Sequence, residues 1–426
     1  MIETIKNAWR VADLRKKILF TFFIIIIFRV GSVIPVPFVD VQLLRNEMSQ
    51  SANEFFSYLS ILTGGGLEYG AIFAMSVTPY INSSIIIQLL AVAIPALERL
   101  AQEGEEGQKK LAQITRYTTI ILGLIQGTAY FFYLKGSGYL TVSSTGAVVF
   151  AAFVIILCLT AGSALVMWLG EQIDVKGIGN GISILLFAGI ISRGPQAFRA
   201  LVAYWNINKI IPIVIVIAFL AVVGFIVWMT NAERRIPVQY AKRVVGNKMY
   251  GGQNTHIPIK VNMSGVMPII FASSILMLPT MILSFMGTNH TDSFWYKVLR
   301  PFSVQGIFYA VIYFFLIIAF AYFYTTIQFN PVEMANNLRK NGGSIPGIRP
   351  GKPTSDFISK ILSRITLMGA FFLSVIAILP IIVSNLAKIN ISLGGTSILI
   401  LVGVALDTVQ NLESQMMMRH YKGFLD

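Results

Sequence analysis

The sequence predicts an all-α integral membrane protein with ten transmembrane helices, and three observations support this fold class. Of the 426 residues, 55% are hydrophobic and only 12% are charged, whereas a soluble globular protein carries roughly 25% charged residues because its surface faces water. The mean hydropathy is +0.71. The apolar residues are gathered in segments of about 20, the length that a helix needs to cross the hydrocarbon core of a bilayer. A water-soluble enzyme and a disordered protein are therefore excluded.

Ten apolar segments are predicted to span the membrane, because lipid offers no hydrogen-bond partner to a backbone that is not helical. The fifth segment is short for a full crossing. The predicted spans are residues 18–36, 71–95, 117–134, 147–169, 178–193, 210–229, 264–285, 306–327, 365–386 and 395–412.

The distribution of charge predicts the orientation in the membrane. The chain has 33 Lys and Arg against 19 Asp and Glu, a net charge of +14. An even number of spans puts both termini on one side, and an excess of Lys and Arg marks that side as cytoplasmic. With the termini inside, the cytoplasmic segments hold 24 basic and 13 acidic residues, and the outer segments hold 8 and 5. Arg193, Arg199 and Lys209, around one outer loop, run against this bias. Most of the net charge therefore reflects topology.

Two long basic loops are predicted on the cytoplasmic side. In residues 230–262, Val238, Tyr240 and Val244 alternate around Gly246-Asn247, which predicts a hairpin. In residues 328–363, the stretch GGSIPGIRPGKPTS predicts a turn-rich tip, because glycine and proline break helices. On the opposite side, residues 37–70 end in FFSYLSILTGGGLEYG, a short amphipathic stretch followed by three glycines that form a potential hinge.

Residues that could support catalysis are nearly absent from the spans. The three histidines fall in loops or the tail, no HExxH occurs, and Asp407 lacks a second intramembrane aspartate. The glycine-rich segment before Lys352 has Pro346 and Pro353 where a phosphate loop requires glycine and serine or threonine. We therefore expect no catalytic residue, no metal site and no cofactor. Arg29 and Asp407 lie near span ends, where a structural role is favoured.

Two spans are unusually polar. The second contains Ser76, Thr78, Asn82, Ser83, Ser84 and Gln88, and the seventh contains Ser273, Ser274 and Thr280. Hydrogen bonding between helices is one explanation. A functional explanation is favoured by a proline near the start of each span, Pro79 and Pro268, which predicts helices that bend or shift.

Five motifs that occur in order carry a resemblance to a known family. The chain closely resembles the bacterial SecY subunit of the protein translocon over essentially its whole length. The motifs are GAIFAMSVTPYINSSIIIQLL, WLGEQIDVKGIGNGISILLF, HIPIKVNMSGVMPIIFASSI, IPGIRPGKPT and GGTSILILVGVALDTVQ.

The resemblance implies a protein-conducting channel built from two five-helix halves in inverted pseudo-symmetry, residues 1–205 and 206–426. It implies a plug over residues 57–70, represented by Ser57, Tyr58, Leu59, Ile61, Leu62, Gly64, Gly65 and Gly66. It also implies an apolar pore ring at Val77, Ile81, Ile182, Leu186, Ile270 and Ile400. The spacing of i, i+4 independently puts residues 77 and 81, and residues 182 and 186, on one helical face each.

The resemblance further implies a lateral gate between the second and third spans on one side and the seventh and eighth on the other. Its polar residues would be Thr78, Asn82, Ser83, Gln88, Gln126, Ser273, Ser274 and Thr280. The basic loops would bind a motor or a ribosome through Arg349, Arg234, Arg235, Lys242, Arg243 and Lys248.

The partners implied are the SecE and SecG subunits, the SecA motor ATPase, the ribosome, signal-bearing precursor polypeptides and membrane lipids. ATP would be used by the motor and not by this chain. The expected location is the bacterial plasma membrane, with both termini cytoplasmic.

A secondary transporter of a small solute is the alternative, with the polar residues of the second and seventh spans coordinating substrate. The near absence of charge at the membrane midplane argues against ion coupling, and a transporter leaves the two large basic loops without a role. A passive channel that moves unfolded secretory polypeptides and releases apolar segments into lipid is the leading hypothesis.

Overall fold

The structure is a computed structural model, and it describes residues 6, 8–50, 60, 63–207, 209–240, 243–245, 248–250, 254–286, 294, 301, 307–387 and 395–422. The chain divides into two compact units. The first comprises Met1–Val214, Ser274–Val304 and Asn390–Asp426, and the second comprises Ile215–Ser273 and Gln305–Ile389. The first unit therefore includes the last helix of the chain. The predicted halves, residues 1–205 and 206–426, stay a prediction.

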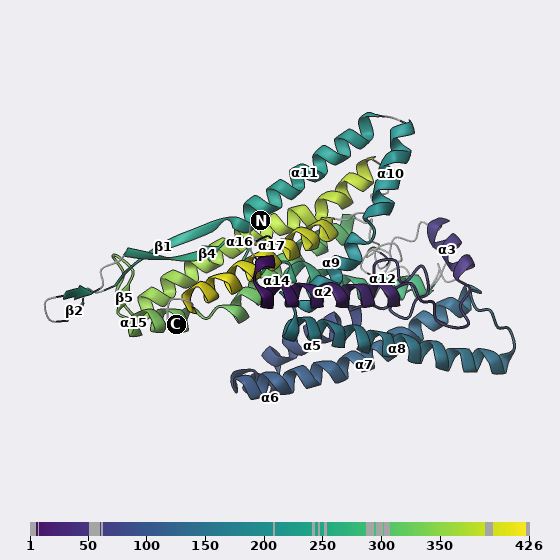
Figure 1. Ribbon diagram of the computed structural model, residues 1–426, viewed down its shortest axis with the longest axis horizontal. Coiled ribbons are helices and arrows are strands. Elements are labelled where there is room, and N and C mark those ends of the chain that lie inside the picture. Colours follow the sequence, from purple (N-terminus) through teal and green to yellow (C-terminus); the bar gives the residue numbers. More distant parts are fainter. Residues whose placement is uncertain are drawn as a thin grey trace. The chain divides into compact units, whose positions relative to one another are not determined.

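The first unit is a bundle of helices. The two longest, α7 (Glu105–Gly136) and α8 (Thr145–Lys176), pack side by side (Figure 1). Helix α8 also packs against α2 (Ala12–Gly31) and α9 (Gly181–Ile191), and α9 packs against α17 (Gly395–Lys422). The unit also contains α3 (Val41–Gln50), α5 (Thr78–Ala93), α6 (Pro95–Gln102) and α10 (Gly194–Ile207).

A close approach of backbones fixes α8 against the irregular segment that precedes α5. This segment contributes Leu67 and Ala74 to an apolar core that it shares with α7 and α8. A Cβ atom added at Gly162 of α8 would collide with the carbonyl oxygen of Ile72. Glycine is therefore required at position 162 because a larger residue would push the segment away from α8.

The second predicted span differs from the observed helix. Ala71 forms an isolated β-bridge with Pro35, residues 72–77 form turns, and α5 begins only at Thr78. Pro79 lies in the first turn, where its missing N–H leaves no hydrogen bond unmade, so it starts the helix and does not bend it. The bend lies at the other end: α5 and α6 meet at 106° on either side of Ile94, which precedes Pro95. A residue before proline is driven out of the helical region, and Ile94 is extended.

The second unit combines membrane-length helices with a small sheet. Helix α14 (Ile307–Gln328) packs along α16 (Lys352–Ala387), which also contacts α15 (Pro331–Lys340) (Figure 1). Helix α11 (Ile210–Asn231) enters this unit, and α12 (Met267–Met286) leaves it. Pro268 occupies the first turn of α12, as Pro79 does in α5, whereas Pro279 lies inside the helix.

Helix α16 begins thirteen residues before the predicted span of 365–386. The stretch GGSIPGIRPGKPTS was expected to exclude helix throughout, yet its last residues form the first turn of α16. Pro353 is the second residue of the helix, a position that tolerates proline.

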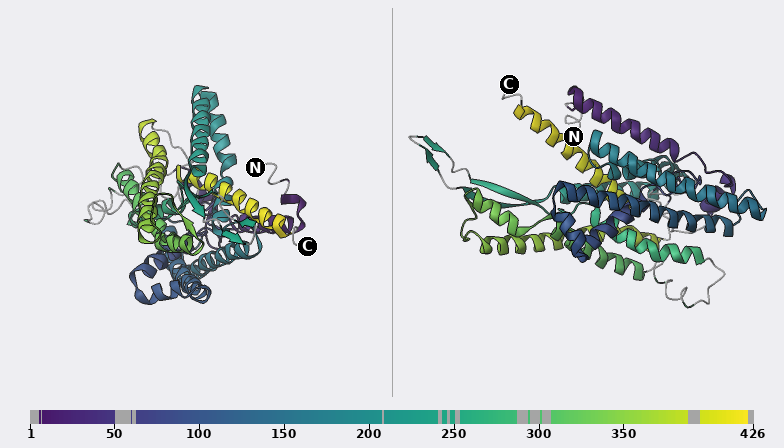
Figure 2. Two further views of the ribbon diagram at one scale, coloured as in Figure 1. Left: turned by 90° about the vertical axis from the view of Figure 1, so that its left-hand side faces the viewer. Right: turned by 90° about the horizontal axis from the view of Figure 1, so that it is seen from below.

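The first basic loop forms strands that pair as an antiparallel ladder. Strand β1 (Glu233–Tyr240) pairs with β4 (Asn254–Lys260) from Glu233 opposite Lys260 to Gln239 opposite Asn254. Beyond this pair, β2 (Arg243–Val245) and β3 (Lys248–Tyr250) form the predicted hairpin (Figures 1 and 2). The hairpin is therefore confirmed, with its turn residues 246–247 outside the described residues.

Among the described residues, seven helices are long and apolar enough to cross a membrane, or up to eight if the bent α5–α6 pair counts as one span. All ten predicted spans overlap a described helix. The structure is therefore consistent with ten crossings, and the count itself stays a prediction.

The close packing of α8 predicts a contrast between two glycines of this helix. Gly162→Ala should destabilise the protein by roughly 1–3 kcal/mol because it overpacks the contact with Ile72. Gly146→Ala, also in α8, meets no atom within 4 Å and should be neutral or stabilising by up to about 1 kcal/mol. Thermal unfolding in detergent measures both. Equal midpoints for the two variants would contradict the assigned contact.

Candidate functional site

The predicted pore-ring residues lie on four helices. In the first unit, Ile182 and Leu186 are on α9 and Ile400 is on α17, the helix that packs against α9. Val77 and Ile81 stand at the start of α5. Ile270 is on α12, in the part of that helix that belongs to the second unit. Val77, Leu186 and Ile400 are buried, and Ile81, Ile182 and Ile270 are partly buried.

The start of α9 is positioned by a compact turn after α8. Asn180 caps the helix, since its side-chain oxygen accepts a hydrogen bond from the N–H of Ser183 at 3.0 Å. The carboxylate of Asp174 accepts a hydrogen bond from the N–H of Gly181 at 2.7 Å. A Cβ atom at Gly181 would collide with the carbonyl oxygen of Gly170. This turn therefore fixes where α9, and with it Leu186, stands against α8.

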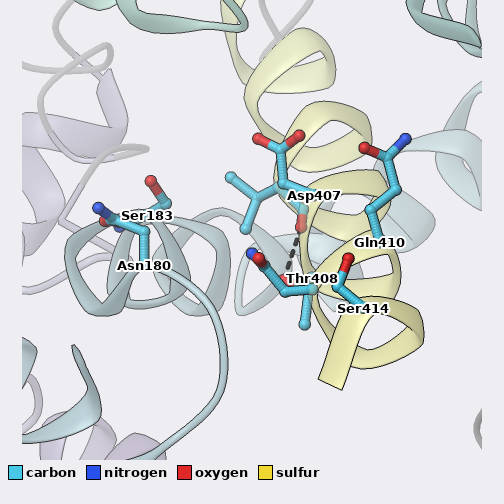
Figure 3. Close-up of a pocket in the computed structure, with 8 residues that line it drawn as sticks. Asn180, Ser183, Asp407, Thr408, Gln410 and Ser414 are labelled. Carbon is cyan, nitrogen blue, oxygen red and sulfur yellow. Dashed lines mark hydrogen bonds between the residues drawn. The ribbon is translucent and has the colours of Figure 1, made fainter. Parts of the chain in front are cut away.

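A polar cavity of about 280 Å³ lies between α9 and α17, and we call it the polar mouth. Asn180, which caps α9, and Ser183 of α9 face Asp407 and Thr408 of α17 across it (Figure 3). Its other lining residues are Val404, Gln410, Asn411 and Ser414. Val404 and Thr408 follow Ile400 at steps of four, so the polar mouth continues the helical face that carries the predicted ring residue.

The predicted lateral-gate residues of α5 and α7 are mostly enclosed. Ser83 donates a hydrogen bond to the carbonyl oxygen of Thr115 at 2.7 Å, which ties α5 to α7. Gln88 donates to the Ser84 hydroxyl within α5 at 3.0 Å. Asn82 and Gln126 are buried, and Thr78 is partly buried. Ser83 thus joins two helices of the same predicted side of the gate.

The remaining predicted gate residues lie on α12. Ser273 donates to the carbonyl oxygen of Ile270 at 2.9 Å, Ser274 is partly buried, and Thr280 lies further along the same helix. The gate assignments stay predictions.

Five of the eight residues named for the predicted plug lie outside the described residues, namely Ser57, Tyr58, Leu59, Ile61 and Leu62. The three glycines that follow are described and buried in a turn. Gly64 and Gly65 have φ values of +64° and +91°, which favour glycine. The glycine turn, residues 63–70, therefore has a defined conformation.

The two basic loops are joined in one three-stranded sheet with the order β4-β1-β5. Strand β5 (Gly343–Ser344) pairs with β1 through Gln239 opposite Ser344 and Tyr240 opposite Gly343. We call this sheet, together with residues 345–351, the basic platform. Arg234, Arg235 and Arg349 are exposed on it. The pairing of the two loops could not be predicted from the sequence, because a strand of two residues has no detectable periodicity.

An apolar cluster packs the basic platform against α15 and α16. It combines Ile236 and Val238 of β1 with Ile259 of β4, Ile345 after β5, and Leu338, Ile358, Leu362 and Ile365 of α15 and α16. The Thr354 hydroxyl donates to the carbonyl oxygen of Arg349 at 2.9 Å, which closes the turn onto the start of α16. These contacts hold Arg349 at a fixed place relative to β1.

The structure says less about the remaining contacts of the predicted basic residues. Arg235 forms an exposed ion pair with Glu233 at 2.7 Å, which contributes little to stability in water. Arg243 and Lys248 lie on β2 and β3, and Lys242 lies outside the described residues. Their role stays a prediction.

Comparison with known proteins shows similarity over the whole chain. The family model described as SecY matches residues 71–409. Protein translocase subunit SecY of Bacillus subtilis is 46% identical, that of Halalkalibacterium halodurans is 44% identical and that of Mycobacterium bovis is 42% identical. Each of these matches covers 100% of both chains.

Solved structures share the fold. The structure described as that of a protein conducting channel has a TM-score of 0.68 at 18% identity and covers 94% of this chain and 92% of that chain. Sec61 in the canine ribosome-channel complex has a TM-score of 0.61 at 16% identity, with the same coverage.

The apolar cluster below the basic platform predicts a stability contrast. Ile345→Ala removes a buried side chain and should cost roughly 2–5 kcal/mol, because the cavity left behind is only partly refilled. Ile327→Ala, at a side chain 51% exposed, should change stability by less than about 0.5 kcal/mol. Thermal unfolding and proteolysis of residues 343–351 measure the two variants. Equal protease resistance in both would count against a platform held by this cluster.

Proposed function

This chain belongs to the SecY family and forms the protein-conducting channel of a translocase, and we propose that it is a passive channel, not an enzyme, driven by a partner. The full-length match to translocase subunits carries this proposal. It also favours the channel over the secondary transporter of a small solute. ATP would be consumed by a motor and not by this chain.

The predicted pore ring suits transport of polypeptides of any sequence. An apolar constriction loses its water and blocks hydrated ions without binding them. Branched side chains such as those of Ile81 and Leu186 yield around a passing chain, whereas a charged ring would trap some segments and repel others. The polar mouth next to Ile400 would keep an unfolded peptide hydrated before it reaches the constriction.

The lateral gate would recognise signal sequences by their hydrophobicity. Hydrogen bonds between helices in membranes contribute about 0.6 kcal/mol each on average, so a gate with a few of them opens at low cost. An apolar signal helix gains free energy when it passes into lipid. Hydrophobicity then serves as the recognition signal, and apolar segments leave sideways.

We propose the basic platform as the docking surface for the SecA motor or the ribosome. The support for this is that β5 ties the two basic loops together, so that exposed Arg234 and Arg349 are presented by one rigid unit. Contacts with ribosomal RNA would be salt-sensitive and largely independent of sequence, since they involve phosphates. Sec61 was solved in a ribosome-channel complex.

We further propose that SecE and SecG are companion subunits, and that the chain lies in the bacterial plasma membrane with both termini cytoplasmic. The excess of basic residues in the segments assigned to that side supports the orientation.

A reconstitution experiment tests the function. The chain, with SecE and SecG, is placed in vesicles and supplied with SecA, ATP and a signal-bearing precursor. Protection of the precursor from added protease is expected, and it should require ATP. Uptake of a small solute with no precursor protection would support the transporter instead.

Replacing a pore-ring residue by a polar one should weaken the seal. Ile81→Asn and Ile270→Asn should each raise the resting ion leak several-fold and admit defective signal sequences, because an amide wets the apolar constriction. Ile86→Asn, at a side chain 39% exposed on the same helix as Ile81, is the control and should leave the leak unchanged. Ion conductance of proteoliposomes is the measurement. Parental leak and signal selectivity in both ring variants would overturn the ring assignment.

Reversing the charge at the tip of the basic platform should block docking. Arg349→Glu should lower ATP-driven transport by at least about tenfold with folding intact, because like charges facing each other across an interface cost several kcal/mol. Arg199→Glu, on α10 at the side predicted to be external, is the matched control. Transport rates and thermal midpoints are compared. Normal transport in Arg349→Glu would refute this docking role.

A further inference from the structure

A mostly enclosed ion pair anchors the glycine turn to the end of α9. Arg193 follows α9, and its Nη2 lies 2.6 Å from Oε1 of Glu68 in the turn. The two side chains are only 16% and 20% exposed. Ser60 completes the cluster: its hydroxyl donates to the same Glu68 oxygen at 2.9 Å and accepts from Arg193 Nη2. Residues far apart in the sequence are thus joined at one point.

A second contact fixes the backbone of the same turn. Nη1 of Arg29, near the end of α2, donates to the carbonyl oxygen of Gly64 at 2.6 Å and to the Ser192 hydroxyl at 3.2 Å. A Cβ atom at Gly64 would stand 2.9 Å from the Ser192 oxygen and 3.0 Å from the Cα atom of Gly189. The turn therefore packs directly on the last turn of α9.

The energetics of the pair favour positioning over stabilisation. Removing two charges from water offsets most of their attraction, so a buried ion pair adds little net stability. Among the described residues, Nε of Arg193 is also buried without a hydrogen-bond partner. Loss of either partner, in contrast, leaves an uncompensated buried charge. Such an ion pair favours one position of the glycine turn over others, but it adds little to the free energy of unfolding of the protein.

The helix that receives this anchor is one that carries the predicted pore ring. Leu186 precedes Arg193 by seven residues, about two helical turns or roughly 10 Å along the axis. The glycine turn is itself the second part of the predicted plug, residues 57–70, and Ser60 in the first part touches the pair. A movement of α9 that widens the ring therefore acts on the anchor as well.

We propose that Arg193 and Glu68 are positioning residues that set the resting place of the plug against α9 and so maintain the seal of the idle channel. This inference rests on the proposed channel function. Neutralising either partner releases the turn, and the idle channel then leaks ions and opens to defective signal sequences, while transport of normal precursors continues.

The test compares four changes in reconstituted protein: Glu68→Gln, Arg193→Gln, the exchange Glu68→Arg with Arg193→Glu, and the control Glu105→Gln. Glu105 forms an exposed ion pair with Lys109 and is 85% exposed. Each single change at the anchor should raise the resting leak several-fold. The exchanged pair should return the leak toward the parental value, and the control should match the parent.

Three readouts separate the possible outcomes: resting ion leak, transport of a normal precursor and the thermal midpoint. Parental leak in both single variants overturns the proposal. Loss of thermal stability without rescue by the exchange also overturns it, because the pair is then merely structural. Glu68→Asp keeps the charge on a shorter side chain and serves as a second variant if Glu68→Gln folds poorly. It should give a leak between that of the parent and that of Arg193→Gln. If Glu68→Asp and a folded Arg193→Gln both show the parental leak, the proposal is refuted. Failure of the parent to move precursor counts against the channel function and not against the anchor.

Discussion

Hydrocarbon offers no hydrogen-bond partner to a peptide group, and each part of this chain meets that constraint in its own way. The long helices satisfy their backbone internally. The irregular residues 63–77 pair only part of their backbone within the segment, as in the hydrogen bond from the N–H of Ala74 to the carbonyl oxygen of Ala71 at 2.9 Å. Other groups obtain partners from neighbouring elements: the Tyr130 hydroxyl donates to the carbonyl oxygen of Leu67 at 3.2 Å, and the N–H of Ile72 donates to the carbonyl oxygen of Ile34 at 2.9 Å. Non-helical backbone is tolerated in a membrane protein where protein encloses it. The position of this segment is thus determined by its surroundings.

The two units satisfy their polar groups in different ways. In the first unit, single polar side chains such as Ser83 and Arg29 each satisfy one backbone oxygen of a neighbouring element, Thr115 of α7 and Gly64 of the glycine turn. In the second unit, a sheet outside the spans pairs its own backbone and buries an apolar cluster against α15 and α16. The first arrangement permits small shifts, since few contacts are involved. The second gives a rigid base for exposed arginines, which a docking surface requires.

Composition and hydrophobic length were sufficient to predict the fold class and to locate a helix in every predicted span, because lipid imposes both. Element ends were less predictable. Pro353 was interpreted as a helix breaker, but the first turn of α16 accepts it. Pro79 predicts a helix that bends or shifts, but the bend lies at Ile94, before Pro95, since the sequence does not show which proline starts a helix and which ends one.

The site was predictable where it follows from helical spacing or family motifs, and unpredictable where it depends on distant pairing. The i, i+4 spacing grouped Ile182 with Leu186. Nothing in the sequence linked Gly343 with Tyr240, because the pairing strand has only two residues. The only unusual feature of Arg193 in the sequence is its positive charge on the side of the membrane predicted to be external. Its partner Glu68 is separated from it by 125 residues. The Asn180 cap and the polar mouth were missed, although an Asn preceding a helix is a recognised capping signal.

That separation has a consequence for the order in which the protein is made. Glu68 leaves the ribosome 125 residues before Arg193, which at about 5–20 residues per second is an interval of roughly 6–25 seconds. During this interval α7 and α8 are synthesised while the acidic residue has no guanidinium beside it. The glycine turn therefore acquires its final hold only when α9 is complete. The nascent protein thus passes through a stage in which four apolar helices exist and the turn that precedes α5 has its contacts with α2 and α7 but not the one with Arg193, and completion of α9 ends that stage.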